Sequence, residues 1–177
     1  EEDLGNHHNP DSEYEWIIDP IHGTTNFVHK VPHFCISIAC LHKGKPEHGV
    51  IVDPMRQEEF VASKGKGCNV NGHRARCGSK GSLLGALVGM GGAEPDFAEQ
   101  QANVYQKLLT EDAMVRSAGS AALDLAYVAT GRLDGVWFKG LSLWDMAAGA
   151  LMIQETGGLL GDFDGGAQHL KTGDIVA

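Results

Sequence analysis

Carboxylates at the ends of predicted secondary-structure elements are the first candidates for chemistry in this sequence. Asp19 ends a short β-favouring run, and Asp145 lies in the first turn of a predicted helix, where the positive end of the helix dipole gathers anionic groups. Mg²⁺ is bound in proteins by hard oxygen ligands, usually a few carboxylates with phosphate and water. Further oxygen ligands are available from Glu1, Glu2 and the carbonyl of Ile21. These residues predict a divalent-metal site.

A turn that could bind phosphate follows Asp19 closely. Gly23, Thr24 and Thr25 open a weakly helical stretch, so their backbone N–H groups lack helical partners, and glycine lets an anion approach the backbone. Each feature has a simpler structural explanation on its own, because Asp-Pro is common in turns and an acid at a helix start stabilises the helix. The order of the features along the chain favours a combined metal and phosphate site.

His22 stands between the acid and the turn, at a position where another carboxylate would suit a Mg²⁺ site. Neutral imidazole is a better ligand for Zn²⁺, Co²⁺ or Ni²⁺ than for Mg²⁺. In one interpretation His22 takes part in metal binding and changes the preferred metal. In the alternative, the imidazole turns to solvent and the neighbouring acids hold the ion with an additional water.

The composition is that of a globular protein and excludes several functions. Of 177 residues, 42% are hydrophobic and 21% charged, and with a net charge of −9 and no basic stripe we expect no direct binding of nucleic acid. No apolar run reaches the roughly 18 residues that span a bilayer, and no signal segment opens the chain, which predicts no membrane association. Four cysteines without C-x-x-C spacing are typical of buried free thiols in a reducing compartment, so we expect a cytoplasmic protein.

The order of predicted elements indicates one layered domain. The first part reads as a meander of antiparallel strands, with strands over residues 16–19 and 33–44 and two more around the turn at Asp53. The later part has helical patterns over residues 95–112, 120–131 and 142–158, and strand patterns over residues 81–90 and 134–138. The fold class is therefore α+β or layered α/β, in a single domain over residues 1–177 that is incomplete at both termini. Trp16 is expected in its core.

Two long motifs resemble the signatures of the inositol monophosphatase family. The stretch WIIDPIHGTTNF, residues 16–27, is similar to the first signature, D-P-[IL]-D-G-T-[TS]-N-F. The stretch LWDMAAGALMIQETGG, residues 143–158, is similar to the second, W-D-x-A-A-G followed by a helix and E-x-G-G. Glu1 and Glu2 resemble the family's acid pair, and residues 116–135 resemble the run before the second signature. The resemblance covers essentially the whole chain and is closest to bacterial members.

The resemblance implies a sugar-phosphatase fold, Mg²⁺-dependent hydrolysis of a small sugar or polyol phosphate monoester, lithium sensitivity and a homodimer. The implied metal ligands are Glu1, Asp19, the Ile21 carbonyl, His22 and Asp145. Thr24 and Glu1 would orient and deprotonate the attacking water. The implied substrate contacts are Glu1, Ile21, His22, Gly23, Thr24, Gly119, Ser120, Ala121 and Asp145. In this chemistry metal ions polarise phosphoryl oxygens and activate water, so no covalent residue is required.

Three departures from the family pattern affect this expectation. His22 replaces an Asp that is a metal ligand in the family, which makes Mn²⁺ or another transition metal an alternative to Mg²⁺. Phe138 stands where inositol-preferring members often carry a Glu that contacts a substrate hydroxyl. The family segment that precedes Glu1, which supplies a further catalytic acid, is not part of this sequence.

Two functions therefore remain open, with a chance match in an unrelated protein as a third alternative. The first is a metal-dependent phosphatase, favoured by the retained acids and Thr24. The second is a catalytically impaired member that acts as a regulatory or binding protein, as bacterial members can with the transcription machinery. His22 favours this second function.

Overall fold

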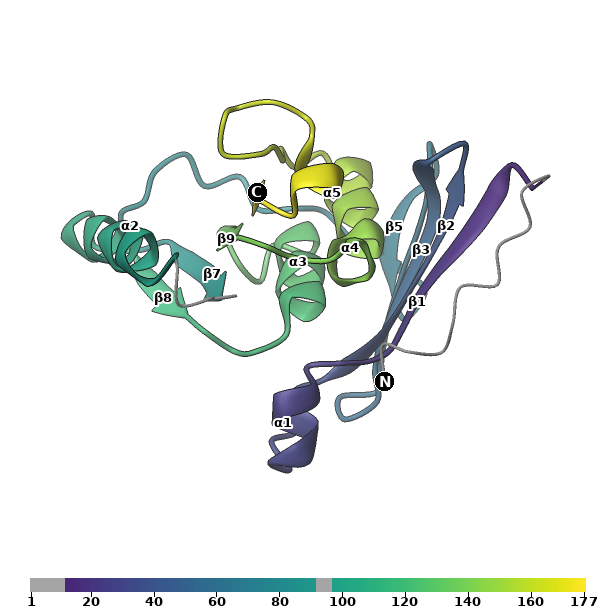
Figure 1. Ribbon diagram of the computed structural model, residues 1–177, viewed down its shortest axis with the longest axis horizontal. Coiled ribbons are helices and arrows are strands. Elements are labelled where there is room, and N and C mark those ends of the chain that lie inside the picture. The colour runs from purple at the N-terminus through teal and green to yellow at the C-terminus, as the bar shows by residue number, and fades with distance from the viewer. Residues whose placement is uncertain (1–11, 92–96) are drawn as a thin grey trace.

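In a computed structural model, which describes residues 12–91 and 97–177, sheets and helices form successive layers (Figure 1). A large antiparallel sheet stands at one side, and two helices pack against it. A smaller sheet and an outer helix complete the other side. The layered α+β class predicted from the sequence is confirmed.

The large sheet is the predicted antiparallel meander. Its six strands pair in chain order, so each strand lies beside the one that follows it in sequence. They are β1 (Tyr14–His22), β2 (Cys35–His42), β3 (Lys45–Asp53), β4 (Glu58–Ser63), β5 (Gly67–Val70) and β6 (His73–Arg74). The first strand is longer than the predicted run of residues 16–19, because its pairing with β2 continues at both ends.

β1 has one face toward the core and one exposed face. Ile17 packs against the core and Asp19 is buried, whereas Tyr14, Trp16 and Ile18 at the alternate positions are 52%, 65% and 55% exposed. Successive side chains of a strand point to opposite faces, which explains the separation. The prediction that Trp16 lies in the core is therefore wrong. Its aromatic ring belongs to an exposed apolar face of the large sheet.

Helices α3 (Ala121–Ala129) and α4 (Leu143–Thr156) form the layer between the two sheets. Most of their residues are buried, and α4 contacts the first five strands of the large sheet. α4 ends at Gly157, whose φ of 87° is in the left-handed region that glycine adopts readily. Ser120 precedes α3 as predicted, although its side chain makes no capping hydrogen bond.

Gly149 of α4 packs directly against Leu125 of α3. A Cβ added to it would lie 2.5 Å from the Cβ of Leu125, and this contact cannot be relieved without moving a helix. We expect Gly149→Ala to lower the free energy of unfolding by about 2 kcal/mol, as overpacking of a tight core does. Urea unfolding measures the change. Gly81→Ala is the control, since an added Cβ there meets nothing within 4 Å. Equal stability of the two variants would contradict this account.

The small sheet has the strand order β10-β9-β7-β8. Its members are β7 (Leu87–Gly91), β8 (Met114–Arg116), β9 (Gly135–Phe138) and β10 (Ile175–Val176). β7 runs parallel to β8 and to β9, while β10 is antiparallel to β9. The strand predicted over residues 81–90 begins only at Leu87, because residues 82–85 form a bend and a turn. The outer helix, α2 (Ala98–Thr110), packs on the small sheet through Leu108 and Val104.

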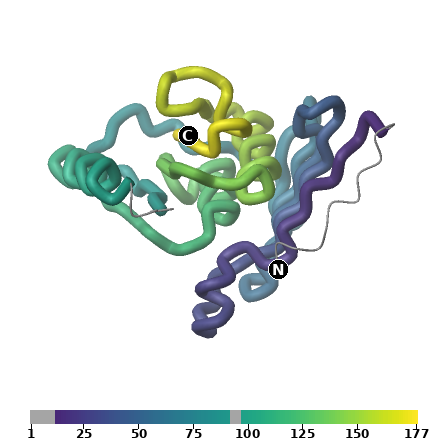
Figure 2. Tube along the Cα trace, in the orientation of Figure 1, coloured from purple at the N-terminus to yellow at the C-terminus, as the bar shows by residue number. Residues whose placement is uncertain are grey.

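Two short helices complete the described chain. α1 (Thr24–Val28) follows β1, and α5 (His169–Thr172) precedes β10. The yellow C-terminal segment lies beside β9 in Figure 2, where the backbone of Ala177 pairs with that of Val136. No helix in the described part of the chain is long and apolar enough to cross a membrane.

Candidate metal and phosphate site

An irregularity near the end of β1 brings Asp19 and His22 to the same side of the strand. Asp19 is opposite Ser37 and His22 is opposite Cys35, so three steps along β1 correspond to two along β2. In a regular strand, two residues separated by three positions would point to opposite faces. The additional residue of a β-bulge re-aims a side chain. As a result, Nδ1 of His22 lies 2.9 Å from Oδ2 of Asp19.

Asp145 is held in place by the start of α4. Its Oδ2 accepts a hydrogen bond of 2.7 Å from the backbone N–H of Ser142, in a capping-box arrangement. Its other carboxylate oxygen, Oδ1, lies 3.2 Å from Nδ1 of His22. The structure therefore brings together three of the residues that the sequence analysis selected, from the first strand and the last long helix.

Nδ1 of His22 faces one carboxylate oxygen of Asp19 and one of Asp145. Oδ1 of Asp19 accepts the N–H of Ile21 at 3.1 Å, which leaves Oδ2 to face the imidazole. Among the described residues, Asp19, His22 and Asp145 form the one group of three His, Cys, Asp or Glu side chains whose ligand atoms lie within 4.8 Å of one another. The group is a candidate metal centre.

The charge of His22 depends on two opposing influences. Burial by itself would lower the pKa of the imidazole, but hydrogen bonds to Asp145 and Asp19 and the charges of these acids outweigh burial and raise the pKa to about 9. The imidazole is therefore protonated at neutral pH. The alternative in which His22 turns to solvent is wrong, because the side chain is 12% exposed and contacts both acids.

The predicted phosphate-binding turn begins directly after this cluster. Gly23 has a φ of 96°, and a Cβ there would lie 3.2 Å from the carbonyl oxygens of Gly119 and His33. The hydroxyl of Thr24 donates to the Ile21 carbonyl at 3.1 Å. These contacts place Ile21, Gly23 and Thr24 around one tight turn, and Thr24 is exposed at its surface.

Asn26 ties this turn to the loop that contains Gly119. Its side-chain nitrogen donates to the carbonyls of His33 at 2.8 Å and Ala118 at 2.9 Å. A Cβ at Gly119 would lie 2.8 Å from the same nitrogen, so only glycine allows the loop to come this close. The sequence analysis did not select Asn26, although this residue belongs to the stretch that resembles the first signature.

The remaining predicted residues differ in what they could offer a substrate. Gly119 is exposed, whereas Ser120 and Ala121 are 2% and 6% exposed. The hydroxyl of Ser120 lies 3.7 Å from the thiol of Cys35 and faces the interior. The side chains of Ser120 and Ala121 are therefore buried, which leaves only backbone groups that these two residues could offer to a substrate. Glu1, predicted as a metal ligand and as a base, lies outside the described residues.

Asp124 is a buried acid that the sequence analysis missed. It is 2% exposed in the first turn of α3, and its Oδ2 has no hydrogen-bond partner among the described residues. A Cβ at Gly89 would lie 3.0 Å from this oxygen, which places the carboxyl against β7. Burial raises the pKa of Asp124 to about 7, against the opposing charge of His22. In the sequence, the signal that could have identified Asp124 is that it is an acid within the otherwise apolar helical pattern of residues 120–131.

The donor atoms of the cluster fit a transition metal better than Mg²⁺. Nδ1 of His22 lies 2.9 and 3.2 Å from the two carboxylate oxygens, close to the separation of neighbouring ligand atoms around one small ion. A nitrogen among the donors suits Zn²⁺, Co²⁺ or Ni²⁺, whereas Mg²⁺ is held by oxygen. Binding of any ion at Nδ1 requires loss of its proton, so the proton and the metal compete for one place.

Sequence comparison places the whole chain within one known group of proteins. Residues 1–177 match the profile of the inositol monophosphatase family. The chain is 52% identical over 170 residues to the Nus factor SuhB of Pseudomonas aeruginosa, and the alignment covers 94% of this chain and 63% of that relative. The chain thus spans less than two thirds of the length of this relative.

Solved structures show the same arrangement of layers. The extragenic suppressor protein suhB of Bartonella henselae superposes with a TM-score of 0.91 at 39% identity, over 94% of this chain and 64% of that one. The inositol monophosphatase of Anabaena superposes with a TM-score of 0.87 at 40% identity, over 95% of this chain and 68% of that one. These similarities agree with the fold expected from the two motifs.

Proposed function

Because the chain belongs to the inositol monophosphatase family, we propose that it hydrolyses small sugar or polyol phosphate monoesters with a bound divalent metal ion. The observation that carries this proposal is the meeting of Asp19 and Asp145, whose carboxylate oxygens both face Nδ1 of His22. These three side chains would hold the ion, with the Ile21 carbonyl nearby. A bound metal ion supplies polarisation of the phosphoryl oxygens and activation of a water.

The turn after β1 would bind the phosphate of the substrate. The backbone N–H groups of Gly23 and Thr24 are suited to this role, since they precede the first hydrogen-bonded turn of α1. The hydroxyl of Thr24, with Glu1, would orient the attacking water. Gly119 and the backbone of Ser120 and Ala121 would contact the alcohol part of the substrate.

Phe138 would broaden the range of substrates. Phe138 is 3% exposed, and a Cβ added to Gly91 would lie 3.1 Å from its ring. Its side chain is therefore a tightly packed hydrocarbon ring without a hydrogen-bond acceptor. A site that hydrogen-bonds a substrate hydroxyl discriminates strongly against analogues without that group. Phe138 cannot provide this discrimination. We therefore propose activity on several monoesters rather than selectivity for inositol monophosphate.

The metal dependence of phosphate release tests the proposal. We expect slow release from glycerol 2-phosphate with Mg²⁺ and release about tenfold faster with Mn²⁺ or Co²⁺, because the imidazole of His22 is a better ligand for these ions. The metal-supported rate should increase toward pH 9, where Nδ1 loses its proton. Asp19→Asn is the control and should abolish release with every metal. A faster rate with Mg²⁺ than with Mn²⁺ and Co²⁺ would contradict the assignment of His22.

One observation favours a second function. Protonated His22 pairs with both acids and offsets one of their two negative charges, so the three side chains are held together without an ion. The relative from Pseudomonas aeruginosa is named a Nus factor. The alternative proposal is a regulatory partner of the transcription machinery. Binding to a transcription complex, together with no phosphate release under any metal, would favour this alternative.

The proposed cellular form is a homodimer in the cytoplasm, as the resemblance to the family implies. The exposed apolar side chains of Tyr14, Trp16 and Ile18 supply a surface that a second subunit could cover. Sedimentation of the intact protein measures its oligomeric state, and a monomer at micromolar concentration would contradict the dimer.

A further inference from the structure

Ser37 places a hydroxyl in a row of core side chains that is otherwise apolar. On β2 the neighbouring positions of this row, Cys35 and Ala39, belong to the hydrophobic core, and Ser37 is 2% exposed. A hydroxyl buried in this way costs free energy unless it makes a hydrogen bond. The Ser37 hydroxyl donates to the carbonyl oxygen of Trp144 at 3.3 Å, so it joins β2 to the first turn of α4.

The position of Ser37 relates it to both acids of the candidate metal centre. Ser37 is paired with Asp19 in the register of β1 and β2. Directly paired residues of antiparallel strands share a face, with Cβ atoms about 4.5–5.5 Å apart. Trp144, which accepts the hydrogen bond from Ser37, immediately precedes Asp145. A single side chain therefore lies beside one acid and is bonded to the backbone next to the other.

The start of α4 is the part of this helix that packing holds least. The residues from Met146 to Ile153 are all buried, and a Cβ added to Gly49 of β3 would lie 3.0 Å from the Cα of Ala148. Residues 143–145, in contrast, are only partly buried. Close packing thus fixes the middle of α4 on the large sheet, whereas its first turn depends more on polar contacts such as the one from Ser37.

Cys35 has a corresponding place two residues earlier on β2. It is paired with His22, and its thiol lies 3.7 Å from the hydroxyl of Ser120, the residue before α3. The two residues of β2 that are opposite Asp19 and His22 therefore each contact the start of a helix. β2 is the element that sets the first strand and the helix layer at a fixed spacing near the cluster.

We propose that Ser37 is a positioning residue for the candidate metal centre, because it fixes the separation of Asp19 and Asp145. The inference rests on the proposed function, in which these two acids and His22 hold a divalent ion. Ser37 anchors the backbone before Asp145, and the N–H of Ser142 then orients the Asp145 carboxylate. Loss of a group that orients metal ligands typically lowers metal affinity by roughly 10- to 100-fold.

Binding of Co²⁺ to the intact protein tests the inference without reference to turnover. Co²⁺ accepts imidazole and carboxylate ligands, and its visible absorption reports both occupancy and ligand arrangement. We expect Ser37→Ala to raise the dissociation constant for Co²⁺ about tenfold and to change the absorption band. In the metal-free protein, the amide of Ser142 should exchange with solvent faster in Ser37→Ala, relative to the amide of Ala150 in the middle of α4.

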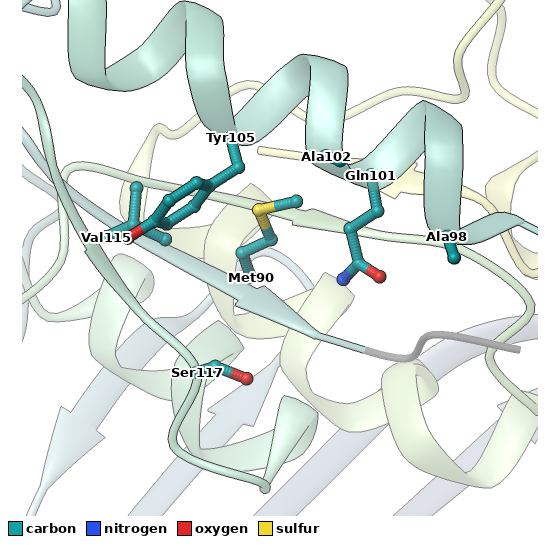
Figure 3. Close-up of a pocket in the computed structure, with 7 residues that line it drawn as sticks. All are labelled: Met90, Ala98, Gln101, Ala102, Tyr105, Val115 and Ser117. Carbon is teal, nitrogen blue, oxygen red and sulfur yellow. The ribbon is translucent and has the colours of Figure 1, made fainter. Parts of the chain in front are cut away.

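Two variants serve as controls. Ser117→Ala is the same substitution in the wall of a pocket of about 370 Å³ between α2 and the small sheet, whose lining residues include none of the cluster (Figure 3). Thr156→Val removes a buried hydroxyl near the other end of α4, where it donates to the carbonyls of Met152 and Ile153. Thr156→Val should lower the melting temperature about as much as Ser37→Ala does. Neither control should change the affinity for Co²⁺.

The outcomes separate this inference from the proposed function. Unchanged Co²⁺ affinity in Ser37→Ala, an equal loss of affinity in Thr156→Val, or no Co²⁺ binding by the parent protein would overturn the role of Ser37. Phosphate release by a parent protein whose Co²⁺ affinity does not respond to Ser37→Ala would uphold the phosphatase and reject the inference. Weaker Co²⁺ binding by Ser37→Ala alone, with no phosphate release by the parent protein, would uphold the inference and reject the phosphatase.

Discussion

His22→Asp should raise Mg²⁺-supported phosphate release by about a hundredfold, which corresponds to about 2.7 kcal/mol of transition-state stabilisation. In the parent chain, the imidazolium lies between the carboxylates of Asp19 and Asp145. Aspartate would remove a positive charge that competes with the metal and would supply a hard oxygen ligand. The measurement is kcat/KM for a phosphate monoester in the intact protein over a range of Mg²⁺ concentrations.

His22→Asn is the matched control for this substitution. It removes the imidazolium without adding a carboxylate, so a gain that depends on the new ligand should appear only in His22→Asp. Without metal, three neighbouring carboxylates repel one another, and His22→Asp should melt at a lower temperature than the parent. Mg²⁺ should then raise its melting temperature more than that of the parent. If neither turnover nor the response to Mg²⁺ changes, position 22 is not a metal ligand.

Asp124→Asn should remove a pH dependence of stability of about 3 kcal/mol between pH 5 and pH 8. The pKa of Asp124 is raised by burial from 3.8 to about 7 in the folded chain. Between these values the folded state keeps a proton that the unfolded state has released. The contribution of Asp124 to stability is therefore largest at low pH, falls as the pH rises toward 7, and is constant above it.

Urea unfolding of the parent and of Asp124→Asn at several pH values measures this effect. The difference in unfolding free energy should grow in favour of the variant from pH 5 to pH 7 and then level off. Asp112→Asn changes an exposed acid in the same way and should leave the pH dependence as it is. If the unfolding free energies of the parent and of Asp124→Asn change with pH in parallel, burial does not hold the Asp124 carboxyl neutral.

The sequence identified the acids of the candidate site because their positions follow from local rules. Asp19 was placed near the end of an apolar strand, and Asp145 in the first turn of a helix with a serine before it. Strand pairing in chain order was also predictable from β2 to β6, since short turns separate these strands. The layered fold follows from the change between strand and helix patterns along the chain.

The geometry that makes the acids a cluster was not predictable in the same way. A period of two places Asp19 and His22 on opposite faces, and only the irregular pairing with β2 brings them together. The burial of Asp124 and the exposure of Trp16 depend on which elements pack on which face. Sequence periodicity gives the alternation of a strand but does not show which face a later helix will cover.

The capping of α4 by Asp145 has a consequence for the order of events during synthesis. Asp19 and His22 leave the ribosome with β1, whereas Asp145 emerges much later, with α4, and is oriented only once α4 has begun to form. Contacts of such long sequence separation form late, because they depend on closing a large loop. A nascent chain that stops before α4 would hold His22 against one acid alone. Occupancy of the cluster by a metal would therefore report that the chain has been made and folded through α4.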